Sequence, residues 1–356
     1  MKLKKLAKVL ALGTLMVLNT GVGHAAENED LVNMAPTHRD VLVATVKNDD
    51  GQSRELRMNV FLPKNNGKET PALIYVHGGG WAMGNYEGDD AKNKPASKNV
   101  MAADNASTYK VFKSVLNDGI AFISVDYRLN NEAAFPAPLY DVKAAIRFVK
   151  AHAAEYNIDK NRIAIGGSSA GAHLSAEAAL TAGDADCEGD IGGNLEENSR
   201  VVCCVDYYGP TDLLTMAPEM NPDFQAKEDA QRTHDAPEAN ESKLLGFSGE
   251  GEGVGVLREI VNNNDTSSPY WEKAQLALNA SPINHVTKNA PPFFVAHGGH
   301  DSLVPIAQSI RLVNKLTDFG VENIFMVNSK APHGYQGEVT NKAMRDWLKQ
   351  KLFSQQ

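Results

Sequence analysis

One serine of this chain lies between two glycines in a pattern typical of a nucleophile. Residues 167–171 read Gly-Ser-Ser-Ala-Gly, which matches the G-x-S-x-G pattern of a serine on a sharp turn between a strand and a helix. The glycines relieve the crowding of that turn. The pattern is short and recurs by chance, but here it falls between a predicted strand, residues 162–165, and a predicted helix, residues 169–182. We therefore predict Ser169 as the nucleophile and not its neighbour Ser168, which lacks the symmetric glycines.

A serine nucleophile needs a base and an acid that orients the base. His333 lies in a loop after the predicted strand 323–327, and Asp301 follows the predicted strand 293–296. The chain order Ser169, Asp301, His333 is the order of serine, acid and histidine in one large class of hydrolases. Asp301 has an alternative interpretation as a helix N-cap, and two other aspartates compete for its role, Asp206 and Asp212.

The other histidines are expected to be structural. His297 and His300 flank the acid, and four more have no motif around them: His152, His173, His234 and His285.

A glycine run follows another predicted buried strand, residues 72–76. It reads His77-Gly-Gly-Gly-Trp81, the type of loop whose backbone N–H groups approach a tetrahedral intermediate closely. A flexible glycine turn is the alternative interpretation. His77 is expected to orient this loop, and Trp81 either lines an acyl pocket or packs in the core.

Short β-rich runs alternate with helical patterns, which predicts a mostly parallel sheet covered by helices on both faces. Residues 41–46 and 57–62 are expected to open it as a hairpin around Asp50-Gly51. Further strands are predicted at 120–125 and 201–207, and further helices at 107–116, 139–156, 306–319 and 339–352. Two polar stretches interrupt the alternation, residues 85–105 and the acidic residues 213–279. We expect the second to form a partial cap.

The first 25 residues have the pattern of a signal peptide, with Lys2 to Lys8 basic, residues 10–18 apolar, and small residues before a cleavage point after Ala25 or Ala26. An uncleaved membrane anchor is the alternative. Export to the periplasm or the extracellular space is therefore expected for a mature domain of residues 26–356. Loss of four lysines and no acidic residue changes the formal charge from -9 to -13. This balance argues against binding to nucleic acid or stable association with anionic membranes.

The chain has three cysteines, Cys187, Cys203 and Cys204. Adjacent residues on a strand point to opposite faces, so at most one of the pair could bridge to Cys187. Export permits such a disulfide, and three free thiols are the alternative. Their spacing is not that of a zinc site.

These motifs resemble the α/β-hydrolase superfamily over nearly the whole mature chain, and most closely bacterial carboxylesterases related to hormone-sensitive lipase and the bifunctional feruloyl and acetyl xylan esterases. Besides the segments above, the likeness includes Asp126-Tyr-Arg-Leu129 and Ala280-Ser-Pro-Ile283. The resemblance implies ester hydrolysis without a cofactor or metal. It also implies that the oxyanion donors are the N–H of Ala170 and two of those of Gly79, Gly80 and Trp81. Residues 85–105 are longer than the corresponding stretch of the family, so the mouth of the site is expected to differ from that of its members.

The favoured function is that of a serine esterase acting on short-chain esters of small molecules or oligosaccharides, with acetyl or feruloyl esters of plant polysaccharides as candidates. One alternative is a peptidase of the prolyl oligopeptidase type, although only about 45 residues precede the core strands here. Others are an amide or formamide hydrolase, because the triad does not choose a leaving group, and a non-catalytic binding protein on this scaffold. The sequence leaves the oligomeric state open.

Overall fold

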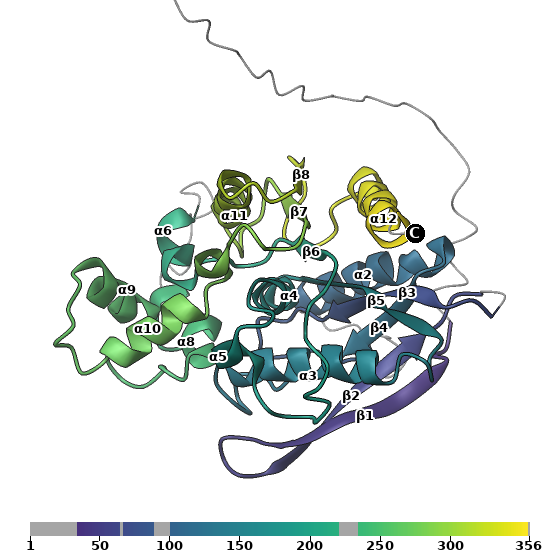
Figure 1. Cartoon of the computed structure of the whole chain (residues 1–356). Helices are drawn as coiled ribbons and strands as arrows, with labels where there is room; N and C mark the ends of the chain where they lie inside the picture. Colours follow the sequence, from purple (N-terminus) through teal and green to yellow (C-terminus); the bar gives the residue numbers. More distant parts are fainter. Residues whose placement is uncertain (1–33, 65–66, 89–99, 221–233, 355–356) are drawn as a thin grey trace, which may run out of the picture. The chain divides into compact units, whose positions relative to one another are not determined.

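A central sheet of eight strands holds the parts of the chain together (Figure 1). The computed structural model describes residues 34–64, 67–88, 100–220 and 234–354, and only the backbone of 100–106. The strand order is β1-β2-β4-β3-β5-β6-β7-β8. The strands are β1 (His38–Lys47), β2 (Ser53–Phe61), β3 (Thr70–Val76), β4 (Ala121–Val125), β5 (Ile158–Ser168), β6 (Cys204–Tyr207), β7 (Phe293–Gly298) and β8 (Asn323–Asn328).

The predicted mostly parallel sheet is confirmed. Only the pairs β1–β2 and β2–β4 are antiparallel. Strands β1 and β2 form the predicted hairpin, closed by the Gly51 N–H bonding to the Asn48 carbonyl. Strands β3 and β4 are buried along their whole length, as expected for parallel strands covered on both faces. Because β3 and β5 to β8 are parallel, their carboxyl ends share one edge, where α/β sheets hold their functional groups.

Helices cover both faces of the sheet, as predicted (Figure 1). On one face lie α2 (Val100–Lys113), the 3₁₀ helix η1 (Ser114–Asp118) and α12 (Glu338–Phe353), and on the other lie α3 (Ala137–Ala151), α4 (Ala170–Leu180) and α11 (Ile306–Asp318). The predicted helix 107–116 begins later than α2, and the predicted helix 139–156 ends later than α3. Apolar periodicity continues through the turn after α3, but the chain leaves the helix at His152 to reach β5.

The segment between β6 and β7 contains the whole predicted cap region. Its described part folds into η2 (Leu213–Thr215), α6 (Met216–Glu219), α8 (Asn240–Leu244), α9 (Val254–Asn262) and α10 (Trp271–Asn279). Leu213, Leu244 and Leu257 pack in the same buried cluster as the sheet residues Ile165 and Val295. The described part of this insertion, within residues 213–279, therefore shares the core of the sheet. Another short helix, α5 (Ala185–Glu188), follows α4.

The predicted signal peptide lies outside the described residues, as do parts of the two polar stretches, residues 89–99 and 221–233. The three cysteines are all thiols, with Cys203 and Cys204 buried and Cys187 partly exposed. Burial raises the pKa of the Cys187 thiol to about 11. This arrangement corresponds to the alternative of three free thiols.

Candidate active site

Ser169 lies at the sharp turn between β5 and α4. Its backbone φ of 53° is left-handed, an unfavourable conformation for a residue with a side chain, found where surrounding structure enforces it. The Ser169 N–H bonds to the Tyr207 carbonyl on β6 at 2.8 Å. A Cβ on Gly167 would lie 2.6 Å from the Val76 carbonyl oxygen, and one on Gly171 only 2.1 Å from it. Both positions therefore leave no room for a side chain, because the turn itself crowds Gly167 and β3 approaches both glycines closely.

The glycine loop follows β3 beside this turn. Gly79, Gly80 and Trp81 have φ values of 116°, 59° and 55°, so the loop is a left-handed turn in which Trp81 is strained. A Cβ on Gly79 would lie 2.2 Å from the Met83 carbonyl oxygen. Ala170 is the first residue of α4, where a helix leaves N–H groups without intrahelical acceptors. The predicted donor groups therefore come from the ends of two neighbouring strands.

Two histidines hold the glycine loop in place. The Nδ1 of His77 donates to the Gly78 carbonyl at 2.8 Å, and its ring stacks on Tyr127, consistent with an orienting role. His173 accepts from the indole Nε1 of Trp81 at 3.2 Å and donates from Nε2 to the Ala280 carbonyl at 2.8 Å. Burial lowers the pKa of His173 to about 4, so the ring is neutral. Trp81 is 2% exposed and packs in the core.

Asp301 and His333 form a buried hydrogen-bonded pair. The Oδ2 of Asp301 lies 2.7 Å from Nδ1 of His333, and Oδ1 accepts from the N–H groups of Leu303 and Val304 at 2.9 Å each. Burial alone would raise the pKa of Asp301, but His333 and a further contact from His297 hold it well below its usual range. Asp301 is therefore an ionised acceptor that orients His333.

The loops that carry this pair are packed against each other. A Cβ on Gly298 would lie 2.4 Å from the Ala331 carbonyl oxygen and 2.5 Å from that of Pro332. The His300 N–H bonds to the Ala331 carbonyl at 2.9 Å. The glycine at the end of β7 thus lets the acid loop and the histidine loop come close enough to pair.

The two competing aspartates have structural partners. Asp212 caps η2 through the Leu214 N–H and pairs with Arg311 at 2.9 Å. Asp206 is fully buried within β6, and its Oδ1 accepts from the Gly209 N–H at 2.8 Å. Burial raises the pKa of Asp206 to about 6, against lowering contributions from that N–H and from His297.

The raised pKa of Asp206 predicts a pH-dependent change in stability. Because the pKa of Asp206 is higher in the folded state, its bound proton adds to the free energy of unfolding at pH about 4 and below. This contribution is lost as the pH rises through about 6 and the buried carboxyl ionises. An Asp206→Asn variant stays neutral and can still accept from Gly209. We therefore expect its advantage over the wild type in free energy of unfolding to grow by about 2 kcal/mol between pH 4 and pH 8. Urea unfolding at both pH values measures this difference, and an advantage that does not change with pH would contradict it.

Sequence reasoning missed Tyr208. It follows β6 with a φ of 48°, the third strained residue at adjacent strand ends after Trp81 and Ser169. Its hydroxyl bonds to Thr108 at 2.7 Å, and its ring packs edge-on against His333 with centroids 4.6 Å apart. The carbonyl of its neighbour Tyr207 accepts from the Ser169 N–H, and the Tyr208 ring contacts His333. Residues 207–208 therefore lie between the predicted nucleophile and the predicted base. The sequence holds no signal for a tyrosine in this conformation.

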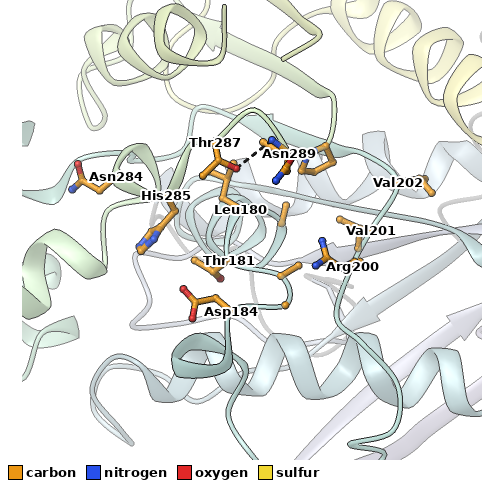
Figure 2. A pocket seen from close by; sticks show the side chains of 15 residues that line it. Leu180, Thr181, Asp184, Arg200, Val201, Val202, Asn284, His285, Thr287 and Asn289 are labelled. Atoms are coloured by element: carbon orange, nitrogen blue, oxygen red, sulfur yellow. Dashed lines mark hydrogen bonds between the residues drawn. The ribbon is translucent and has the colours of Figure 1, made fainter. Parts of the chain in front are cut away.

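A separate cavity of about 540 Å³ lies at the other end of α4 (Figure 2). Its lining includes Leu180, Thr181, Asp184, Arg200, His285 and Asn289. An 11-residue helix is about 16 Å long, and Ser169 lies at its opposite end. The lining segments at 200–202 and 284–291 precede β6 and β7, so the cavity faces the amino-terminal edge of the sheet and holds none of the predicted catalytic groups.

In the described ranges, no three or more His, Cys, Asp or Glu side chains are grouped so as to hold a metal ion. None of the helices in those ranges combines the length and apolar character needed to cross a membrane.

The parallel sheet and the strained serine between β5 and α4 define an α/β-hydrolase fold, which solved esterase structures share. A truncated carbohydrate esterase from gut microbiota aligns with a TM-score of 0.63 and 27% identity, covering 89% of this chain and 99% of that one. An acetyl ester-xyloside bifunctional hydrolase from Caldicellulosiruptor lactoaceticus aligns with a TM-score of 0.62 over 89% of this chain and 97% of its own. At 21% identity it supports the fold alone.

The chain belongs to the BD-FAE family, whose model matches residues 58–316. The expected resemblance is thereby confirmed. Among curated relatives, esterase LipC of Mycobacterium tuberculosis is 30% identical over 249 residues, which cover 70% of this chain and 49% of LipC. The probable carboxylic ester hydrolase LipM of the same organism is 29% identical over 69% of this chain and 44% of its own length. The chain thus spans about half the length of these relatives.

Proposed function

We propose that this protein is an exported serine esterase that hydrolyses short-chain carboxylic esters, with acetyl or feruloyl groups on plant polysaccharide fragments as natural substrates. The observation that carries the proposal is the Asp301–His333 hydrogen bond of 2.7 Å, formed at the same sheet edge as the strained Ser169. The family and the names of the relatives favour esters as the substrate class.

The reaction proceeds in two acyl transfers. His333 Nε2 takes the proton of Ser169 as its Oγ attacks the ester carbonyl, and the N–H of Ala170 with two of the Gly79, Gly80 and Trp81 N–H groups bind the oxyanion. The alcohol leaves with the proton from His333. Water, activated by His333, then attacks the acyl-enzyme and releases the acid and Ser169.

The insertion supports a preference for small acyl groups. Its α9 helix buries the apolar residues Val254, Leu257 and Ile260 in the core, so these side chains do not face a lipid interface. The Nδ2 of Asn240, at the start of α8, lies 2.5 Å from where a Cβ on Gly80 would be, and the Asn130 side chain bonds to the Asn240 carbonyl at 3.4 Å. We therefore propose that residues 213–279 form a partial cap against the glycine loop.

Specificity constants for a panel of substrates test this function. We expect kcat/KM to be higher for p-nitrophenyl acetate and butyrate than for the dodecanoate, and higher still for acetylated or feruloylated xylo-oligosaccharides. Ser169→Ala protein is the blank for each substrate. Higher kcat/KM for long chains with activation at an oil–water interface would identify a lipase, and hydrolysis of an aminoacyl-proline anilide in preference to all esters would identify a peptidase.

A further inference from the structure

A second histidine contacts the carboxylate that orients His333. His297 lies in β7 and is fully buried. Its Nε2 is 3.2 Å from Oδ2 of Asp301 and 3.0 Å from the carbonyl oxygen of Val304. An ionised carboxylate and a carbonyl can only accept hydrogen bonds, so Nε2 carries a proton. It donates this proton to the Val304 carbonyl, and the charged Oδ2 of Asp301 lies beside it as a second, longer contact.

The other nitrogen of this ring also has a partner. Ser309, on α11, places its Oγ 2.7 Å from Nδ1 of His297, and its side chain is fully buried. In a neutral ring protonated at Nε2, Nδ1 is an acceptor, so the Ser309 hydroxyl donates to it. Hydrogen bonds therefore run from Ser309 to His297 and from His297 to the Val304 carbonyl. The Nε2–H of His297 also contacts Oδ2 of Asp301, the oxygen that His333 binds.

The environment makes Oδ2 of Asp301 the oxygen shared by both histidines, because the Leu303 and Val304 N–H groups occupy Oδ1. The Tyr208 ring packs edge-on against both imidazoles, with centroids 4.6 Å from His333 and 6.4 Å from His297. The carboxyl of Asp206 also interacts with His297. Buried donors in these positions set the direction and the basicity of the carboxylate.

We infer that His297 is a positioning residue for the reaction and that Ser309 fixes the tautomer in which His297 acts. The inference rests on the proposed function, since it describes how that site is held. Without the Nε2–H donor, Oδ2 of Asp301 loses one of its two partners and is free to move. The carboxylate of Asp301 then also has one donor fewer near its negative charge, so it stabilises the protonated form of His333 more strongly. Misplacing a catalytic group by a fraction of an ångström is enough to lower turnover substantially.

Three variants and a control separate positioning from general packing. His297→Leu is expected to lower kcat by about tenfold or more with KM little changed, and to move the acidic limb of the kcat/KM profile to higher pH. His297→Gln keeps an N–H donor near Nε2 and should recover part of both effects. Ser309→Ala should shift the limb in the same direction by less, and it keeps the inference testable if His297→Leu does not fold. Ser114→Ala removes another buried helical hydroxyl, bonded to Val111, and should change neither quantity.

A proton NMR signal tests the inference without any substrate. The Nδ1–H of His333 in its short bond to Asp301 should give a far-downfield resonance in the wild type, which His297→Leu and Ser309→Ala shift or broaden and Ser114→Ala does not. An unchanged resonance and an unchanged acidic limb in both variants would overturn the inference. Absence of Ser169-dependent hydrolysis in the wild type would instead overturn the proposed function, and the resonance would still report on the positioning.

Discussion

Replacing Ser169 with alanine is expected to lower kcat for p-nitrophenyl acetate by about a millionfold, to the level that binding and the oxyanion donors support alone. No other side chain at the turn can replace the lost Oγ, because the Ser168 side chain is fully buried and its Oγ lies 3.3 Å from the Tyr75 hydroxyl. Steady-state kinetics together with circular dichroism measure activity and fold in the same samples.

Ser168→Ala is the matched control for this experiment. It removes a neighbouring hydroxyl of the same chemistry and should leave kcat within about tenfold, since it loses only a long, neutral hydrogen bond. Survival of activity in Ser169→Ala combined with its loss in Ser168→Ala would show that the nucleophile is the other serine.

Asp301→Asn is expected to lower kcat by about 10⁴-fold, the size of effect seen when a triad acid becomes an amide. The Leu303 and Val304 N–H groups hold the amide oxygen in the Oδ1 position, which leaves the NH₂ group facing His333. A donor there favours the His333 tautomer that carries its proton on Nε2, and that tautomer cannot accept the proton of Ser169. Measured kcat, with thermal unfolding as the check on the fold, tests this prediction.

Asp212→Asn serves as its control, because Asp212 was one of the two competing candidates and its buried carboxylate pairs with the partly exposed Arg311. Its expected cost is a modest loss of stability, with kcat close to that of the wild type. If Asp212→Asn lost activity as severely as Asp301→Asn, the assignment of the acid would be wrong.

The elements around the site were predictable because each motif has a physical requirement that shows in its residue types. Gly167 and Gly171 are fixed by the close approach of β3, and Asp301 and His333 follow strands that are apolar in sequence. The pairing of Asp301 with His333 depends on Gly298 and on two loops distant in sequence, so the sequence could offer Asp301, Asp206 and Asp212 only as alternatives.

Other parts of the site depend on tertiary contacts that leave no mark in a single sequence. His297 has the same residue type as its neighbour His300, and only the fold brings its ring to Asp301 and Ser309. His173 lies within the helical pattern of α4, and its contact with Trp81 comes from a loop more than 90 residues away. The left-handed backbone of Tyr208 is imposed by packing between β6 and the His333 loop, against the preference of the residue itself.

The core shared by the insertion and the sheet restricts how far the described part of the insertion can move. A lid that swings as a rigid body needs a surface that can separate from the body beneath it, whereas here Leu213, Leu244 and Leu257 are continuous with the apolar core. Separating these three side chains from the core would expose apolar surface to water, at a free-energy cost of about 25 cal/mol per Å². A state in which this segment is lifted off the sheet is therefore rarely populated. We therefore expect the described part of this segment to keep its shape during the reaction, and turnover of the proposed ester substrates to begin at full rate without a lag for opening.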